Sequence, residues 1–230
     1  MKKVLFVCFS FLFCLNCFAQ QTIAIKGRIY NKFTEKYNVL ADSPKLKHGL
    51  YQALYNKKIA VASGQYTRGK RTGLWHFYNI QGTPIQNYNY NTNTLLYESA
   101  ADTVRGIKYF VDGNIDSIAK TTRPIKPGGV YFGYLPYISQ FIMPKDLSDA
   151  DPEYFGAVVE LLVSPGGRLA DYKIRVVSPD GQYNKVADMD MNFLTEEDKR
   201  FIPATINNQP VAVTIYIPCR ITASGRLEYQ

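Results

Sequence analysis

Residues from which disulfide frameworks and metal centres are built are scarce in this sequence. Its 230 residues include four cysteines and two histidines, and Cys8, Cys14 and Cys17 belong to an apolar N-terminal segment. Cys219 is the one cysteine left in the rest of the chain, and a lone cysteine cannot form an internal disulfide. The fold must therefore rest on burial of a hydrophobic core, for which the chain is long enough as one or two domains.

Charge of one sign is not concentrated in any long run. The formal net charge of +8 falls to +6 when Lys2 and Lys3 are set aside (8 − 2). The remaining basic residues are scattered, and no run reaches the roughly five or six like charges of a nucleic-acid-binding tail. We interpret them as solvated strand faces and predict no nucleic-acid partner, while weak attraction to anionic membrane or glycan surfaces stays open.

Catalytic and cofactor-binding motifs are also missing. The sequence has no phosphate-binding loop, no zinc-ligand spacing and no nucleophile elbow. His48 and His76 fall in the first half of the chain, whereas Cys219 alternates in phase with Val213 and Ile215, as expected for a buried thiol. We predict a protein that is not an enzyme and has no catalytic residue, cofactor or metal ion.

The first residues have the pattern of an export signal. Lys2 and Lys3 precede an apolar run over residues 4–13, and Cys17-Phe18-Ala19 places small residues before a cleavage point at Gln20. The run is short for a bilayer span of about 20 residues. We predict a signal peptide over residues 1–19 and a periplasmic or otherwise extracytoplasmic mature chain. An uncleaved anchor and lipid attachment at Cys17 are the alternatives.

Glycines and aromatic residues repeat through the first half. His48-Gly49-Leu50-Tyr51 and Thr72-Gly73-Leu74-Trp75 read as one motif written twice, 24 residues apart (73 − 49). Glycine supplies the positive φ of tight turns, and aromatics two residues apart share a strand face. The pattern predicts a β-rich domain of stacked hairpins over residues 20–120, with Trp75 buried among Tyr51, Tyr66 and Tyr78.

Residues 48–98 resemble MORN-type repeats. Gly64-Gln65-Tyr66, Gly69-Lys70 and the segment from Gly73 to Tyr78 carry the resemblance. The repeat aromatics have two readings: packing, in which they form the core, and an exposed strip that binds a peptide, glycan or lipid. The candidate residues for such a strip are Tyr51, Tyr55, Tyr66, Trp75, Phe77 and Tyr78.

A Pro- and Gly-containing linker is predicted over residues 121–129, followed by an α+β domain over residues 130–230. Residues 134–143 are partly helical in pattern. Two alternating apolar runs, 155–163 and 169–177, flank a Ser-Pro-Gly-Gly turn and predict a hairpin. An amphipathic helix is predicted from the spacing of Val186, Met189 and Phe193. A capping pair is predicted at Thr195 and Asp198. The last strand is predicted over residues 211–221.

Residues 130–222 resemble the C-terminal domain of TonB energy transducers. Gly166-Gly167-Arg168-Leu169, Phe201-Ile202-Pro203-Ala204 and Asn207-Asn208-Gln209-Pro210-Val211 carry the resemblance. It implies a three-stranded antiparallel sheet packed with helices. It also implies an envelope protein-binding module that adds an extended peptide to a sheet edge, and a link to outer-membrane transport.

The resemblance therefore predicts a partner that is an envelope protein or peptide, including an outer-membrane protein, and leaves the oligomeric state open. Strand addition draws affinity from main-chain hydrogen bonds and selectivity from side-chain pockets. A structural or surface-contact role through the MORN-like repeats is the alternative. The predicted peptide-binding edge is the last strand, at Val211, Ala212, Val213, Thr214, Ile215 and Tyr216.

Overall fold

The computed structural model describes residues 21–99, 106–111 and 118–229. The predicted signal peptide over residues 1–19 lies outside these residues. The described chain is β-rich, with two large antiparallel sheets and a small third one, and its helices are single turns. The predicted β-rich architecture of hairpins is confirmed at this level.

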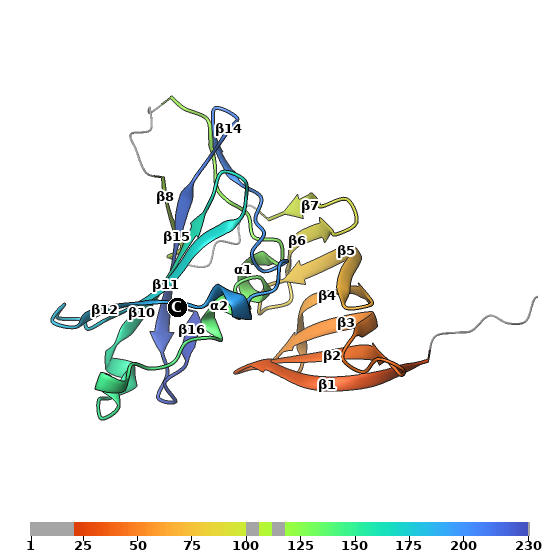
Figure 1. Cartoon of the computed structure of the whole chain (residues 1–230), viewed down its shortest axis with the longest axis horizontal. Helices are drawn as coiled ribbons and strands as arrows, with labels where there is room; N and C mark the ends of the chain where they lie inside the picture. The colour runs from red at the N-terminus through yellow and green to blue at the C-terminus, as the bar shows by residue number, and fades with distance from the viewer. Residues whose placement is uncertain (1–20, 100–105, 112–117, 230) are drawn as a thin grey trace, which may run out of the picture.

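A seven-stranded sheet is formed by the first half of the chain. Each strand pairs antiparallel with the next, so the order in space equals the order in sequence (Figure 1). The turn between the fourth and fifth strands places Arg68 at φ 47° and Gly69 at φ 83°, the left-handed pair that a tight hairpin turn requires. The strands are β1 (Thr22–Tyr30), β2 (Phe33–Leu40), β3 (Lys47–Tyr55), β4 (Ile59–Thr67), β5 (Lys70–Tyr78), β6 (Pro84–Asn89) and β7 (Thr94–Glu98).

Trp75 is the centre of the aromatic core on this sheet. Its side chain is 0% exposed, and its ring lies 5.3 Å from the rings of both Tyr51 and Tyr66. The predicted burial and these two contacts are confirmed. The predicted contact with Tyr78 is wrong, because Tyr78 is three residues along β5 and so faces the other side of the sheet. Phe77 and Tyr90 take that place, at 6.0 and 5.7 Å.

Gly64 provides the space for this indole. A Cβ at Gly64 would lie 2.3 Å from a ring carbon of Trp75, although Gly64 is not among the glycines with a positive φ. We expect Gly64→Ala to lower the free energy of unfolding by about 1–3 kcal/mol, as overpacked cores do. Chemical denaturation followed by Trp fluorescence measures it.

Gly156→Ala is the matched control, because the nearest atom to its Cβ would be 3.8 Å away, on Val177. Equal stability of the two variants would contradict the packing explanation.

The second half forms a six-stranded sheet, so the three-stranded sheet predicted for the C-terminal domain is wrong. The predicted hairpin is present as β10 (Gly156–Val163) and β11 (Leu169–Val177), which pair antiparallel. Alternate residues of these strands are buried, as the sequence alternation predicts. The full order is β12 (Asn184–Asp188), β11, β10, β15 (Val213–Ile221) and β16 (Leu227–Tyr229), with β8 (Lys108–Val111) beside the first half of β15. The sheet is larger than predicted because β8, β12 and β16 also pair with its strands.

Shorter elements connect the two large sheets. The small sheet contains β14 (Gln209–Val211), β13 (Ala204–Ile206) and β9 (Thr121–Thr122). Residues 121–129, which the sequence indicates as a linker, thus supply a strand and a bridge from Ile125 to Ile202. The helices are α1 (Gly129–Phe132), α2 (Leu135–Ile138) and the 3₁₀ turns η2 (Lys145–Leu147), η3 (Pro152–Tyr154) and η4 (Met191–Phe193).

The amphipathic helix predicted at Val186, Met189 and Phe193 is wrong. Residues 184–188 form β12, the edge strand next to β11, and η4 follows. Pairing with β11 satisfies the backbone of this segment, and Lys173 of β11 lies 3.7 Å from Asp188. Tertiary pairing here overrides a spacing that only three apolar residues support.

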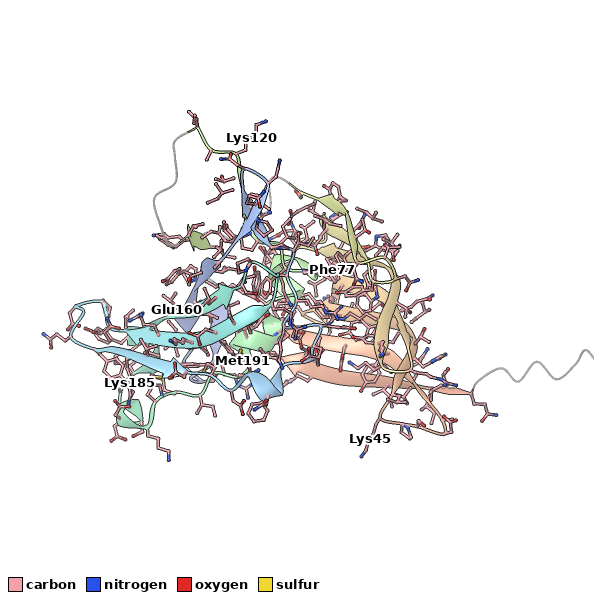
Figure 2. All side chains as sticks on the ribbon, turned by 45° about the horizontal axis from the view of Figure 1, so that its top comes forward. Lys45, Phe77, Lys120, Glu160, Lys185 and Met191 are labelled. Atoms are coloured by element: carbon pink, nitrogen blue, oxygen red, sulfur yellow. The ribbon has the colours of Figure 1, made fainter. Side chains whose placement is uncertain are left out.

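One continuous hydrophobic core joins the two halves, with α1 and α2 between the large sheets (Figure 1). Phe132 of α1 stacks on Phe77 of the first sheet at 5.9 Å, and Tyr137 of α2 lies 5.5 Å from Tyr172 of the second. Figure 2 shows Phe77 inside the molecule, whereas Lys45 and Lys185 project from its periphery.

Candidate functional site

The edge predicted for peptide binding is already occupied, so this prediction is wrong. Residues 213–216 of β15 pair with β10 on one side and with β8 on the other. Val211 belongs to β14 and pairs with Ala204, while Ala212 connects the two strands. Tyr216, at the end of the predicted edge, packs its ring against Phe110 of β8 at 5.1 Å.

The repeat aromatics lie mostly in the core, so the packing reading is confirmed for them. Tyr51, Trp75 and Phe77 are buried, and Tyr55 packs against Phe33 at 5.3 Å. Tyr66 and Tyr78 are half-buried. Tyr51 and Tyr66 have a second role, because both also line a cleft beside the sheet.

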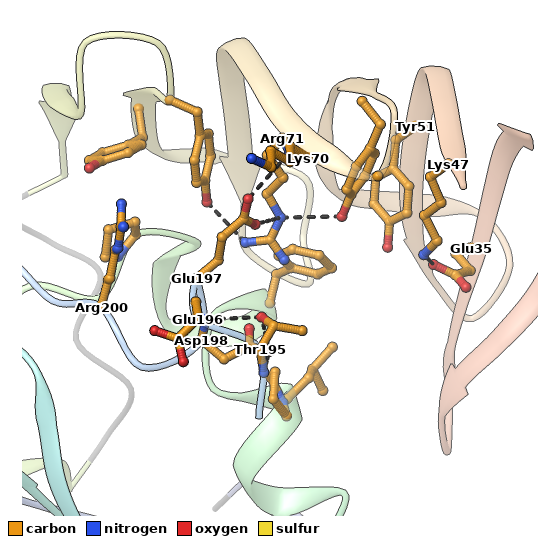
Figure 3. Close-up of a pocket in the computed structure, with 18 of the residues that line it drawn as sticks. Glu35, Lys47, Tyr51, Lys70, Arg71, Thr195, Glu196, Glu197, Asp198 and Arg200 are labelled. Atoms are coloured by element: carbon orange, nitrogen blue, oxygen red, sulfur yellow. Dashed lines mark hydrogen bonds and ion pairs between the residues drawn. The ribbon is translucent and has the colours of Figure 1, made fainter. Parts of the chain in front are cut away.

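This cleft lies between the seven-stranded sheet and residues 195–200, which we call the rim turn (Figure 3). Its volume is about 770 Å³, within the usual range for ligand sites of about 300–1,000 Å³. Four tyrosines, aliphatic and proline side chains of the α1–α2 segment, and several charged groups line it. The tyrosines are Tyr51, Tyr66, Tyr88 and Tyr90.

Arg71, at the start of β5, is the central charged group of the cleft. Its Nε donates to Tyr66 Oη (3.3 Å) and its Nη1 to Tyr90 Oη (3.0 Å). Glu197 of the rim turn lies 3.3 Å from Nε and also accepts the Arg71 backbone N–H at 3.3 Å (Figure 3). Burial raises the pKa of Tyr90, so this phenol keeps its proton at neutral pH.

The Arg71 guanidinium still presents donors to the cleft. Its carbon lies 5.2–5.5 Å from the ring centres of Trp75, Tyr90 and Phe132, and its side chain is 13% exposed. A guanidinium has five N–H donors, and Nη2 bonds to no acceptor among the described residues. No buried side-chain nitrogen there lacks a partner, so Nη2 keeps some exposed surface, and Arg71 is one of the residues that line the cleft.

The rim turn is fixed by its own capping pair. Asp198 Oδ2 accepts from the Thr195 N–H (3.1 Å) and hydroxyl (2.7 Å), and the Asp198 N–H donates to Thr195 Oγ1 (3.2 Å). The capping predicted for Thr195 and Asp198 is confirmed. It holds Glu197 toward the sheet, where it meets Arg71.

Lys126 also holds the rim turn, through hydrogen bonds to its backbone. Its buried ammonium donates to the backbone oxygens of Glu197 (3.1 Å), Asp198 and Arg200 (3.0 Å). Gln86 of β6 in turn binds the Lys126 segment, since its Nε2 donates to Lys126 O at 3.2 Å. Gln86 Oε1 accepts the N–H groups of the next two glycines, Gly128 and Gly129, at 2.8 and 3.0 Å.

Burial lowers the pKa of Lys126 to about 7, although the Asp198 carboxylate acts in the opposite direction. The unfolded chain, with a lysine pKa of about 10.4, therefore binds one more proton than the folded chain above pH 7. We expect the free energy of unfolding to rise between about pH 7 and pH 8.5, with a slope of up to about 1.4 kcal/mol per pH unit. Above about pH 8.5 the raised pKa of the buried Cys219 thiol acts in the opposite direction, because the unfolded chain then loses this proton first. Urea denaturation between about pH 7 and pH 8.5 measures the slope.

The Lys126→Met variant should be less stable, because it leaves three buried carbonyls without their donor, and should lack this slope. If the variant keeps the slope of the parent chain, another group causes it.

Some charged groups at the cleft form ion pairs or cap the rim turn, and others do not. Glu35 pairs with Lys47 at 2.6 Å, Glu196 with Arg168 at 2.6 Å and Glu197 with Arg71, while Asp198 caps the rim turn. By contrast, Lys70 and Arg200 line the cleft and have no ion-pair partner among the described residues. The unpaired charge offered to a ligand is thus positive.

Other groups considered in the sequence have structural roles. His76 Nδ1 bonds Asn87 Oδ1 at 2.9 Å, and His48 Nδ1 accepts the Arg68 N–H at 3.4 Å. Cys219 is 0% exposed and burial raises its pKa to about 12, so the predicted buried thiol is confirmed. Across the described ranges, no group of three histidine, cysteine or carboxylate side chains is arranged to hold a metal ion.

Sequence reasoning did not find Arg71, Lys126 or the rim turn as a site. Arg71 counted as one of many scattered bases, and Lys126 lay in the predicted linker. The sequence signals for the site were the Tyr66 repeat position and the Thr195–Asp198 capping pair.

Comparison of the chain with protein-family models, curated proteins and solved structures gives no match. The resemblances to TonB C-terminal domains and to MORN repeats therefore stay predictions. In the described ranges, no helix is long and apolar enough to cross a membrane.

Proposed function

We propose that this chain is an exported envelope protein that binds a carboxylate-bearing segment of a partner protein in the cleft between the seven-stranded sheet and the rim turn. The observation that carries the proposal is the Arg71 guanidinium, held in place by Tyr66, Tyr90 and Glu197 while Nη2 remains accessible. Because the protein already orients it, this guanidinium can bind a carboxylate with little further loss of side-chain freedom.

The remaining lining supports a peptide ligand. Tyrosine side chains give large, rigid contact area together with a polar group, which suits recognition of protein segments. Lys70 and Arg200 add unpaired positive charge that favours acidic side chains. We therefore place peptide binding in the cleft, and not at the edge of β15 that the sequence predicted.

Export and the place of action rest on sequence features. The signal-peptide pattern over residues 1–19 supports an extracytoplasmic location, and the resemblance to TonB C-terminal domains supports a link to outer-membrane transport. The partner proposed is accordingly an envelope protein, including one of the outer membrane.

Site-directed cross-linking tests the cleft. A photo-cross-linking residue at Asn93, which lines the cleft, should form an adduct with a partner segment in envelope extract. Lys70→Glu with Arg200→Glu reverses the unpaired charges and should reduce that adduct about tenfold or more, since both changes replace attraction by repulsion. Mass spectrometry of the adduct identifies the segment and its acidic residues.

Two controls accompany the cross-linking. A cross-linker at the exposed Lys58 should give no adduct with the same segment, and the exposed Lys145→Glu should leave the Asn93 adduct unchanged. If the double variant folds and keeps the full adduct, the cleft is not the binding site. Loss of the adduct on changing Leu50 and Leu74, exposed on the opposite face of the sheet, would favour the surface-contact alternative.

Export has its own test. The protein purified from its native envelope should have the intact mass of a chain that begins at Gln20, because a signal peptidase removes residues 1–19. A membrane-bound chain that still carries Met1 would contradict this prediction, and a lipid on Cys17 would replace it by an anchored form.

A further inference from the structure

The outer edge of the seven-stranded sheet is a second surface with distinct chemistry. β1 spans nine residues and, within the described part of the chain, hydrogen-bonds to one neighbour, β2 (Figure 1). The Ala41 N–H donates to Gln21 O at 2.9 Å, and the register continues as Ile23 with Val39 and Ile25 with Tyr37.

This register fixes which backbone groups of β1 are free. Hydrogen bonds of an antiparallel pair use every second residue of each strand. The odd-numbered residues of β1 therefore bond to β2, because Gln21 does. The N–H and C=O groups of the even-numbered residues point away from the sheet, at Thr22, Ala24, Lys26 and Arg28.

The side chains along this edge carry positive charges that no nearby carboxylate in the described ranges neutralises. Lys26 stands directly opposite Lys36 of β2, and Arg28 is the next residue on the same face. All three are exposed, and none forms an ion pair with a described residue. The nearby Glu35 faces the cleft side and is paired with Lys47 at 2.6 Å.

Like charges directly opposite each other weaken a sheet, so Lys26 and Lys36 are an unfavourable pair in the isolated chain. An acidic side chain placed next to them would turn this repulsion into attraction. A second copy of the chain would not supply it. When two β1 strands overlap fully and antiparallel, Lys26 faces Lys26 of the other copy.

We propose that β1 accepts an extended segment of another protein as an eighth strand of the sheet, and that this segment alternates acidic with apolar residues. Two carboxylates spaced two residues apart would lie beside Lys26 and Arg28. The apolar residue between them would lie beside Gly27, and the next apolar residues of the alternating segment would lie beside Ile25 and beside Ile23, which is 48% exposed. Main-chain hydrogen bonds to the even-numbered residues hold the strand.

The proposal is independent of the cleft, because the groups of β1 and β2 that carry it are not among the residues that line the cleft. Both surfaces favour acidic ligands, but only β1 requires an extended backbone. This difference separates the two surfaces by experiment.

The probe is a synthetic peptide that alternates glutamate and valine and matches the nine residues of β1 in length. NMR titration of the isotope-labelled chain gives its affinity, and hydrogen exchange of the β1 amides reports strand addition. We expect the Ala24, Lys26 and Arg28 amides to become protected on binding. The same peptide with glutamine in place of glutamate should bind about tenfold more weakly, because two cross-strand charge pairs are lost.

Two variants of the chain test the side chains and the backbone separately. Lys26→Glu with Arg28→Glu should weaken binding of the glutamate peptide about tenfold or more, whereas Lys145→Glu should not. Ala24→Pro removes one outward N–H, a substitution that edge strands tolerate, and should abolish protection while the melting temperature stays near that of the parent chain. The cleft variant Lys70→Glu with Arg200→Glu should bind the probe normally.

Several outcomes would overturn the proposal: equal affinity for the two peptides, no protection of the β1 amides, or undiminished binding to Ala24→Pro. Equal competition by a sulfated polysaccharide, without amide protection, would also overturn it and assign the patch to anionic surfaces instead. Loss of binding in the cleft variant alone would place the probe in the cleft.

Discussion

The arrangement of the whole molecule depends on how one short segment, residues 124–129, is bound on both sides. Gln86 ties it to the seven-stranded sheet through three hydrogen bonds, and Lys126 within it binds three carbonyls of the rim turn. An unpartnered ammonium in such a site would cost several kcal/mol, so the three acceptors are a condition for burying it. The two halves therefore have a defined relative position that apolar packing alone would leave less specific.

This arrangement explains why the cleft has a fixed shape. One wall is the sheet with its tyrosines, and the other is a turn whose backbone is held by Lys126 and whose Glu197 reaches Arg71. Each carboxylate at the cleft is assigned to a partner, which leaves the positive groups for a ligand. The charge that the site offers to a ligand is thus set by which of its groups form ion pairs, and it cannot be read from a count of charged residues.

The sequence predicted what depends on neighbouring residues. Turn chemistry at Arg68-Gly69 and the alternation in β10 and β11 gave the hairpins, and the Thr195–Asp198 spacing gave the cap, because each of these is a local interaction. The sequence prediction failed where the structure depends on a segment that is distant in the chain. β15 seemed to be an edge because β8, its neighbour, comes 104 residues earlier (214 − 110). Lys126 gave no signal, since its partners are backbone carbonyls, which every residue has.

The strand order also implies an order of assembly. In the seven-stranded sheet every strand pairs with the strand that follows it in the chain, so loop closure is short and this sheet can form before the second half of the chain is available. The second sheet cannot close in that way, because β8, β10 and β16 all pair with β15. A chain that ends before residue 213 would keep a nearly complete first sheet, but its hydrophobic strands β8 and β10 would lack their common partner and would be exposed to aggregation.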